Sequence, residues 1–330
     1  MERVGIGLYP TPFEGMPRLE AELDGPRLFV KREDLTGVAL GGNKVRQLDY
    51  LLVEAQRRHC DYVITTCGIQ SNWSRQTVAL ANRMGMRTLL VLRTAQFGRT
   101  PRVFEGNLLL DQIMGAKVKI IKMRINEDPQ DILESEADRL RKKGHNPLIL
   151  GLAEGVSPLA TVAYVDAAIE IVKQAGDVNL DAIIVATSAG ATQAGLTLGV
   201  KMLGLGTRVI GVNVGAFKKK VMVENILNSS NEAAKILGSS IRLNPEDVVI
   251  TDKYAGTDYG IPTRQSIRAI ETLARTEALI LDPVYTSKAM AGLIDMVRSK
   301  EFRKDQNVCF VHTGGVPALF AYGKHFQPNT

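Results

Sequence analysis

The sequence contains few of the residues that build disulfide frameworks and metal sites. Only three of its 330 residues are cysteines, without CxxC spacing, and only four are histidines, which lie far apart and form no HExxH motif. Three cysteines are too few for a disulfide framework and suit a reducing compartment. A zinc site therefore has little support, and we expect no metal.

Targeting signals and long apolar segments are also missing. The first fifteen residues include Glu2, Arg3 and Glu14 and contain no signal-peptide core. The uncharged stretch at residues 182–200 has the length of a membrane span, but it contains hydroxyl side chains and three glycines. A strand, a turn and a helix explain it better. We therefore expect a soluble, cytoplasmic protein that does not enter a membrane.

The excess of positive charge is small and dispersed. Lysine and arginine number 41 and aspartate and glutamate 35, which gives a net charge of +6. The tight basic runs are residues 141–143 and 218–220, and solvated helix faces account for both. Nucleic-acid binding needs a basic patch or stripe, so we do not expect it and keep it only as an alternative.

A regular alternation of strand-like and helix-like segments is the main positive feature. The predicted strands span residues 27–31, 62–66, 88–92, 117–122, 147–150, 182–187, 208–214 and 308–311. The predicted helices span residues 43–58, 71–84, 103–114, 128–143, 158–174 and 191–203. Strands joined by crossover helices predict an α/β fold with parallel sheets, and this length indicates about two domains. Ligands in such folds bind at the carboxyl ends of strands.

Two predicted loops that open helices carry candidate chemistry. In the segment GGNK at 41–44, Lys44 falls in the first turn of a helix, where the helix dipole and free amides lower the pKa of an amine. A neutral amine condenses with a carbonyl, although an ordinary surface lysine is the simpler alternative for this segment alone. Ser71 or Asn72 can cap the next helix, a position that also suits anion binding. Trp73, the only tryptophan, is by itself a core or interface anchor.

Small and hydroxyl residues gather in later predicted loops. Residues 188–192, Ser-Ala-Gly-Ala-Thr, lie between a strand and a helix, where successive amides can surround an anion. A tight turn would select the same residues, and the segment is neither a P-loop nor a dinucleotide fingerprint. The segments DYGIP at 258–262, DPVYT at 282–286 and HTGG at 312–315 add Tyr259 and Tyr285. A lysine, a serine, two tyrosines and an anion loop form a coherent set.

Taken together, these segments resemble the pyridoxal-phosphate-dependent family that contains D-cysteine desulfhydrase and 1-aminocyclopropane-1-carboxylate (ACC) deaminase. The resemblance runs from about Pro10 to Tyr322. It rests on an ordered series of motifs: TP at 11–12, VKRED at 30–34, GGNKVRQL at 41–48, IQSNWSRQT at 69–77, GNLLLD at 106–111, ATQAGL at 191–196, DYGIP at 258–262, LDPVYTSKAMAGLID at 281–295 and HTGGVPALFAY at 312–322.

The resemblance implies the tryptophan synthase β-like α/β fold, fold type II, with two open, mostly parallel sheets and helices on both faces. It implies a large cofactor-binding domain from residues 1–47 and 164–330 and a small inserted α/β domain at 48–163. Lys44 and Ser71 would then meet across the cleft between the domains. The family also implies a homodimer and a small amino-acid substrate.

The resemblance further implies a role for each site residue. Lys44 would bind pyridoxal 5′-phosphate covalently as a Schiff base, Asn72 would bond the ring hydroxyl, and Ser71 would face the substrate. The phosphate loop would be Ser188, Ala189, Gly190, Ala191 and Thr192. Tyr259 and Tyr285 match the two active-site tyrosines. The neighbours of the pyridine nitrogen would be Thr286 and Thr313.

Three departures from the family pattern bear on the substrate. Thr286 stands where ACC deaminases have glutamate. A neutral partner leaves the ring nitrogen less protonated and the cofactor a weaker electron sink, which suits loss of a good leaving group better than ring opening. Trp73 replaces the histidine usual in the family and should reshape the pocket, with a substrate contact through its ring. The phosphate loop reads SAGAT where desulfhydrases commonly read GSAGT.

The sequence therefore predicts a pyridoxal-phosphate-dependent carbon–sulfur lyase. We expect α,β-elimination on a small amino acid, with conversion of D-cysteine to pyruvate, ammonia and sulfide as the first candidate. L-cysteate sulfo-lyase and ACC deaminase are the alternatives within the family. A protein that binds the cofactor without turnover is the alternative from another class.

Overall fold

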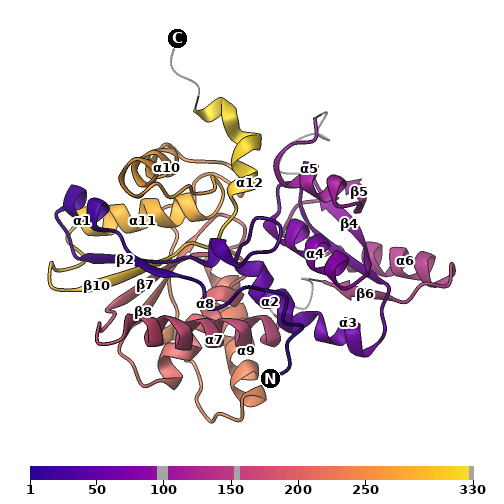
Figure 1. Cartoon of the computed structure of the whole chain (residues 1–330), viewed down its shortest axis with the longest axis horizontal. Helices are drawn as coiled ribbons and strands as arrows, with labels where there is room; N and C mark the ends of the chain where they lie inside the picture. Colours follow the sequence, from indigo (N-terminus) through magenta and orange to yellow (C-terminus); the bar gives the residue numbers. More distant parts are fainter. Residues whose placement is uncertain (95–102, 152–156, 327–330) are drawn as a thin grey trace.

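The computed structural model describes residues 1–94, 103–151 and 157–326, and these residues form two sheets flanked by helices (Figure 1). The larger sheet has the order β1-β2-β10-β7-β8-β9 and the smaller sheet β5-β4-β3-β6. The strands of the larger sheet are β1 (Phe13–Gly15), β2 (Arg27–Lys31), β7 (Ala182–Thr187), β8 (Arg208–Asn213), β9 (Val249–Thr251) and β10 (Asn307–Val311). The strands of the smaller sheet are β3 (Tyr62–Gly68), β4 (Arg87–Arg93), β5 (Lys117–Ile121) and β6 (Pro147–Leu150).

Helices cover both faces of each sheet. In the first half of the chain they are α1 (Pro17–Leu23), α2 (Asn43–Leu51), α3 (Val53–Arg57), α4 (Asn72–Arg83), α5 (Gly106–Ile113) and α6 (Gln130–Arg141). In the second half they are α7 (Pro158–Ala175), α8 (Ala191–Met202), α9 (Lys219–Ile236), α10 (Arg264–Glu277), α11 (Thr286–Arg298) and the short α12 (Val316–Leu319). Figure 1 shows α7, α8 and α9 on one side of the larger sheet and α10 and α11 on the other.

Burial of both faces explains why the central strands are continuous apolar runs. In β7, Ile184 packs in the cluster that includes α10 and α11, whereas Ile183 and Val185 pack in the cluster that includes α7 and α8. The same alternation holds in the smaller sheet. Ile64 of β3 packs against α6, and Val63 packs against α4. A parallel sheet covered on both sides gives this pattern.

The predicted strands and helices all form, with changes at some ends. The predicted helix at 43–58 is divided at Leu52, where ψ is −5° and the helical path is broken between α2 and α3. The predicted helix at 103–114 begins only at Gly106, whose φ of +61° is not helical. The pair β1–β2 is antiparallel, and the other strand pairs of the described residues are parallel.

The sheets draw on different parts of the chain. The larger sheet takes strands from both ends of the sequence, and the smaller sheet takes all four of its strands from residues 62–150. The domain limits at residues 48 and 163 stay a prediction. Within the described residues, no helix is long and apolar enough to cross a membrane, and no cluster of three His, Cys, Asp or Glu is placed to hold a metal ion.

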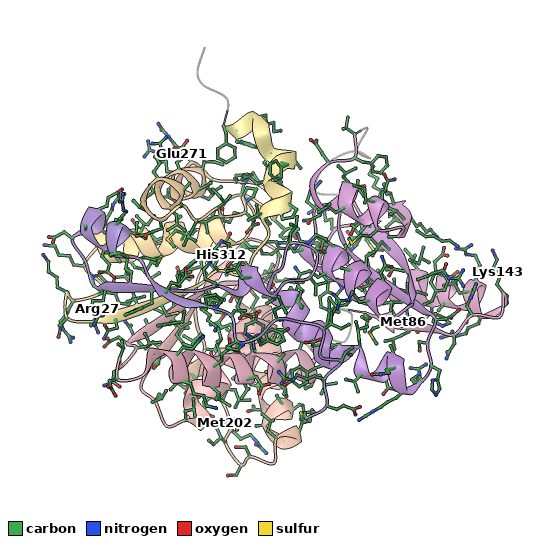
Figure 2. All side chains as sticks on the ribbon, viewed as in Figure 1. Arg27, Met86, Lys143, Met202, Glu271 and His312 are labelled. Atoms are coloured by element: carbon green, nitrogen blue, oxygen red, sulfur yellow. The ribbon has the colours of Figure 1, made fainter. Side chains whose placement is uncertain are left out.

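The carboxyl ends of the central strands meet near the junction of the two sheets. Strands β2, β10, β7 and β8 are neighbours and parallel, so their carboxyl ends lie on one edge of the larger sheet. Helix α2 runs between the sheets, and His312, which follows β10, lies near the middle of the molecule (Figures 1 and 2). The loops with Lys44, residues 188–192, Tyr259 and Thr313 follow β2, β7, β9 and β10 at this edge, whereas Ser71 and Asn72 follow β3 of the smaller sheet.

Candidate active site

Two glycines bring the backbone into α2 immediately before Lys44. Gly41 and Gly42 have φ values of +63° and +129°. A Cβ on Gly42 would lie 2.4 Å from the side-chain nitrogen of Gln76, so only glycine fits there. The Thr36 hydroxyl accepts from the Gly42 amide at 2.8 Å and donates to the Gly42 carbonyl at 2.9 Å. Both the amide and the carbonyl of Gly42 are thus hydrogen bonded to Thr36. Lys44 follows as the second residue of α2.

Lys44 as a whole residue is partly exposed, and its amine makes a single hydrogen bond within the described residues, to Gln47 Oε1 at 3.3 Å. Desolvation lowers the pKa of Lys44 to about 8. We predicted a lowered pKa from the helix N-terminus, but the cause is burial. With this pKa, about one tenth of the amine is neutral at pH 7.

Gln47 connects the lysine to the start of α8. Its side-chain nitrogen donates to Thr192 Oγ1 at 3.2 Å, and the Asn43 side chain donates to the same oxygen at 2.9 Å. Lys44 and Thr192 therefore share Gln47 as a common neighbour although they are far apart in sequence. This contact places the amine and the predicted anion loop in one site.

The N-terminus of α8 has the features of an anion site. Gly190, with φ of +115°, precedes the helix, and no side chain caps it. A Cβ on Gly190 would lie 2.7 Å from Ile226 Cγ1, so this turn also requires glycine. The first amides of a helix have no intrahelical partner, and the helix dipole favours negative charge beside them. Ser188 and Ala189 complete the turn from β7.

Ser71 and Asn72 lie where β3 turns into α4. The Ser71 hydroxyl accepts from the Trp73 amide at 3.1 Å, so Ser71 is the N-cap that its position predicted. The side-chain oxygen of Asn72, Oδ1, accepts from the Asn107 side chain at 2.9 Å and from the Arg75 guanidinium at 3.4 Å. The side-chain nitrogen of Asn72, Nδ2, is left to donate elsewhere. This nitrogen lies beside Gly315, since a Cβ on Gly315 would be 2.8 Å from it.

Trp73 packs in the apolar cluster between α2, α4 and the smaller sheet. Its indole N–H donates to Thr65 Oγ1 at 2.8 Å, and Thr65 in turn donates to the carbonyl of Leu150 at 2.7 Å. These contacts agree with the alternative of a core anchor. Contact between Trp73 and a substrate stays a prediction.

Two tyrosines meet near the carboxyl end of β3. The hydroxyls of Tyr259 and Tyr285 are hydrogen bonded, and their rings meet edge to face with centroids 5.8 Å apart. Burial raises the pKa of both hydroxyls, so both stay protonated across the physiological range. The Tyr259 ring lies 3.5 Å from the Cβ position of Gly68 at the end of β3. The loop after β9, which carries Tyr259, therefore reaches the carboxyl end of β3 in the smaller sheet.

Thr286 and Thr313 lie in the loops that close this region. The Thr286 hydroxyl donates to Asp282 Oδ1 at 2.6 Å and accepts from the Asp282 amide at 2.8 Å, so it is already bonded on both sides. The Thr313 carbonyl accepts from the Asn43 amide at 3.1 Å. A Cβ on the next residue, Gly314, would lie 2.7 Å from Gly42 Cα. The loop after β10 thus packs directly on the lysine loop.

The sequence analysis did not identify Arg75, Asn107 and Asp111. Arg75 donates to the Gly41 carbonyl at 2.6 Å and to Asn107 Oδ1 at 2.7 Å, and desolvation lowers its pKa to about 10. The Asp111 carboxyl is buried, and its oxygens have no hydrogen-bond partner among the described residues. The signal for Arg75 and Asp111 was a charge inside the motifs at 69–77 and 106–111, on helices whose buried faces should be apolar, and Asn107 had no comparable signal.

Asp111 gives a testable pH dependence of stability. Desolvation raises its pKa to about 8, although Arg75 opposes the shift. The folded protein then keeps a proton that the unfolded chain releases, so the free energy of unfolding should fall as the pH rises from about 4 to about 8, by a few kcal/mol. We expect Asp111→Asn to remove this decline, as measured by urea unfolding between pH 5 and 8.

The exposed carboxyl of Asp131 on α6 provides the control, because Asp131→Asn should keep the slope of the wild type. A wild-type stability that does not change over this pH range would contradict the prediction and would mean that Asp111 is ionised beside Arg75.

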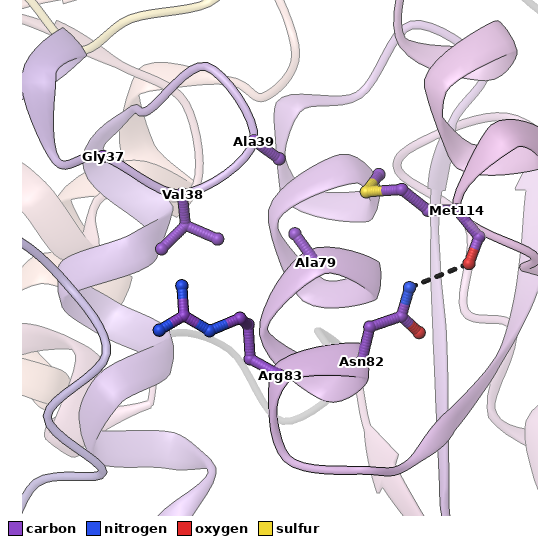
Figure 3. Close-up of a pocket in the computed structure, with 7 residues that line it drawn as sticks. All are labelled: Gly37, Val38, Ala39, Ala79, Asn82, Arg83 and Met114. Carbon is purple, nitrogen blue, oxygen red and sulfur yellow. Dashed lines mark hydrogen bonds between the residues drawn. The ribbon is translucent and has the colours of Figure 1, made fainter.

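Figure 3 shows a pocket of about 320 Å³ that lies apart from these residues. It is lined by Gly37, Val38, Ala39, Ala79, Asn82, Arg83 and Met114. Asn82 donates to the Met114 carbonyl at 2.8 Å, and Arg83 is the single charged side chain of the lining. None of the predicted site residues contributes to this pocket, so the chemistry is not located there.

Comparison with known proteins gives matches along nearly the whole chain. The family described as pyridoxal-phosphate dependent enzyme matches residues 4–314. A D-cysteine desulfhydrase from Klebsiella pneumoniae (strain 342) is 36% identical over 319 residues, which are 96% of this chain and 94% of that protein. A crystal structure of an ACC deaminase homologue is 35% identical, with a TM-score of 0.88 over 98% of this chain and 95% of that one. The predicted fold class is thereby confirmed.

Proposed function

The chain belongs to the D-cysteine desulfhydrase and ACC deaminase family and is a pyridoxal-phosphate-dependent lyase, and on this basis we propose that it catalyses α,β-elimination on a small amino acid. D-Cysteine is the first candidate substrate, with pyruvate, ammonia and sulfide as products. The observation that carries the proposal is the contact of Lys44 with Gln47 and of Gln47 with Thr192. It joins an amine and an anion site through a single side chain.

The residues present fit pyridoxal phosphate. Lys44 supplies the partly neutral amine that a carbonyl needs. Uncapped amides at the start of α8 supply a phosphate site, formed by residues 188–192. Arg75 and Asn107 occupy the side-chain oxygen of Asn72, so its side-chain nitrogen is free to donate to the ring hydroxyl of the cofactor. We place Thr286 and Thr313 beside the ring nitrogen.

The proposed mechanism assigns each proton to a side chain. When bound, the cofactor withdraws electrons from the bonds at the substrate α-carbon. Lys44 Nζ takes the α-proton on its own face, and Ser71 or a tyrosine hydroxyl serves the opposite face. Because burial raises the pKa values of Tyr259 and Tyr285, both hydroxyls stay protonated, and the pair can donate a hydrogen bond to the leaving thiolate. Loss of the α-proton and of the thiolate gives an enamine, which water converts to pyruvate and ammonia.

The environment of Thr286 supports elimination over ring opening. Its hydroxyl proton is directed to Asp282 Oδ1, and the Asp282 carboxylate also accepts from the amides of Val284 and Tyr285. The residue beside the proposed ring-nitrogen position is therefore neutral, in contrast to the glutamate of ACC deaminases. A weaker electron sink suits a substrate with a good leaving group, such as thiolate or sulfite.

A product screen tests the proposal. Purified holoenzyme is incubated with D-cysteine, L-cysteine, L-cysteate, D-serine and ACC, and ammonia, oxo acid, sulfide and sulfite are measured. We expect sulfide and pyruvate from D-cysteine. Release of sulfite from L-cysteate would instead identify the protein as an L-cysteate sulfo-lyase. Formation of 2-oxobutanoate from ACC would identify it as an ACC deaminase. Bound cofactor with no ammonia from any of them would indicate binding without turnover.

Emission of the single tryptophan tests the position of Trp73 relative to the cofactor. Because Trp73 follows Asn72 directly, its indole should lie within energy-transfer range of the bound cofactor. We expect strong quenching in the holoenzyme and recovery in the apoprotein, measured by fluorescence, with Trp73→Phe as the blank. If the ring also contacts the substrate, Trp73→His should change the relative kcat/KM among substrates by roughly 1–3 kcal/mol. Equal emission of both forms and an unchanged ranking would contradict the proposed contact.

We propose that the protein acts as a homodimer, as its family resemblance leads us to expect, and that it is cytoplasmic, as its composition leads us to expect. The three cysteines, Cys60, Cys67 and Cys309, are all free and buried, which suits a reducing compartment. Sedimentation of the holoenzyme over a range of concentrations tests the dimer, and a monomer at every concentration would contradict it.

A further inference from the structure

Lys288 on α11 is a fully buried lysine whose ammonium is surrounded by main-chain carbonyls. Its Nζ donates to the carbonyls of Val214 at 3.0 Å, Ala255 at 2.5 Å and Asp258 at 3.4 Å. Among the described residues, no carboxylate lies within ion-pair distance of this nitrogen. An ammonium has three N–H donors, so three carbonyls can satisfy all of them.

The three carbonyls belong to two loops at the edge where the candidate site lies. Val214 directly follows β8, and Ala255 and Asp258 lie in the loop between β9 and α10 that carries Tyr259. Lys288 lies on α11, three residues after Tyr285, which is the N-cap of this helix. One ammonium therefore joins the helix that Tyr285 caps to the loop that carries Tyr259.

Two glycines shape the loops around this ammonium. Gly256 has a φ of +76°, and its Cβ position lies 3.6 Å from Lys288 Nζ. Gly215 has a φ of +91°, and its Cβ position lies 3.1 Å from the Ala255 carbonyl oxygen and 3.3 Å from that of Asp258. Side chains at these positions would be strained, and one at Gly215 would crowd the carbonyls that bind the lysine.

The nearby acidic groups do not neutralise Lys288 directly. Asp258 Oδ1 accepts from the Tyr259 amide at 2.7 Å, and the Asp282 carboxylate accepts from the amides of residues 284–286, where α11 begins. Burial lowers the pKa of Lys288 to about 8, against the attraction of Asp282 and Asp258. The group is thus mainly protonated at neutral pH, and the carbonyl dipoles compensate its charge. An apolar side chain would avoid this desolvation cost but would remove the donor of the Val214 and Ala255 carbonyls, whereas the Asp258 carbonyl would keep the Ile261 amide at 3.3 Å.

We propose that Lys288 is a positioning residue, which holds the Tyr259 loop so that the Tyr259 hydroxyl stays hydrogen bonded to Tyr285. The inference rests on the proposed function of the two tyrosines as hydrogen-bond donors to the leaving group. Because their hydroxyls form a single bonded pair, displacement of one loop changes the geometry of both. Catalysis by positioned groups is sensitive to displacements of about 1 Å, which can lower the rate about 100-fold.

The test compares Lys288→Met, which keeps the length of the side chain but has no donor, with Lys288→Gln, which retains two N–H donors. Holoenzyme is labelled with fluorotyrosine, and the fluorine resonances of Tyr259 and Tyr285 are assigned with the two Tyr→Phe variants. The kcat and KM values are measured for the substrate identified in the product screen. Lys253→Met is the matched control, since Lys253 lies in the same loop but is exposed and bonded to Asp295.

We expect Lys288→Met to shift or broaden the resonances of Tyr259 and Tyr285, to leave the tyrosines distant from this loop, such as Tyr62 and Tyr164, unchanged, and to lower kcat about 10- to 100-fold with little change in KM. Lys288→Gln should fall between Lys288→Met and the wild type, and it also provides the test if Lys288→Met does not fold. Wild-type resonances and kcat in either variant would overturn the inference. If the wild type converts none of the amino acids, the proposed function fails, but the fluorine spectra still decide the role of Lys288.

Discussion

Replacement of Lys44 by alanine is expected to abolish covalent cofactor attachment and to lower turnover by at least about 10³-fold, since one side chain serves as both nucleophile and base. Absorbance of the dialysed variant should show no covalently bound cofactor. Borohydride reduction of the wild type, followed by peptide mapping, should place the label on Lys44. The exposed Lys173 on α7 is the control, because Lys173→Ala should bind and react as the wild type does.

Lys288 makes this a stringent test, because desolvation lowers its pKa to about 8, as it does for Lys44. The two lysines differ in access and in bonding. Lys44 is partly exposed with one hydrogen bond, whereas Lys288 is fully buried with three. A lowered pKa alone therefore does not select the reactive amine. Label on Lys288 or on any other lysine would contradict the assignment.

The rate at which apoprotein captures the cofactor should report the pKa of Lys44. Only the neutral amine attacks a carbonyl, so the capture rate should rise with pH and level off above about 8, rather than near the ordinary value of about 10.4 for lysine.

Ala191→Asp is expected to lower the affinity for pyridoxal phosphate by roughly 10²- to 10³-fold. Ala191 is the first residue of α8 and is nearly buried, so the new carboxylate would stand beside the phosphate site. Two like charges about 4 Å apart near a protein surface repel by about 4 kcal/mol, and the favourable dipole contributes up to about 2 kcal/mol. Titration of apoprotein with the cofactor, followed by absorbance, measures the affinity.

Ala191→Asn separates charge from shape in this experiment, because it has nearly the same size as aspartate and no charge. We expect the asparagine variant to keep most of the affinity. Equal affinity of the aspartate variant and the wild type would place the phosphate away from α8. Equal loss in both variants would mean that volume at this position, rather than charge, limits binding.

The central strands and the loops after them were predictable because their signals are local. Residues 182–187 form a strand with the predicted limits, since burial on both faces demands a continuous apolar run. Helix α10 was not predicted, although Thr263 and Ser266 form a capping box and the helix is amphipathic. That signal was present in the sequence and was not used. The break at Leu52 has no comparable local signal, because the apolar period continues through it.

In the candidate site, residues with distinctive chemistry could be predicted from the sequence. The residues that position them could not. Lys44 and residues 188–192 stand out by type and position. Arg75 and Lys288 do not, because their main partners are carbonyls of Gly41, Val214, Ala255 and Asp258, and every residue has a carbonyl. The cause of the lowered pKa of Lys44 was also beyond the sequence, since desolvation depends on which residues cover the amine.

The strand order of the larger sheet has a consequence for biosynthesis. Strand β10, near the end of the chain, lies between β2 and β7 and pairs with both. A nascent chain that has not yet released residues 307–311 from the ribosome therefore lacks the strand that joins its N-terminal segment to the rest of the sheet. All strands of the smaller sheet leave the ribosome much earlier and can pair during synthesis. Because the loop after β10 also supports the lysine loop, the cofactor site should be completed only after residues 307–315 have left the ribosome.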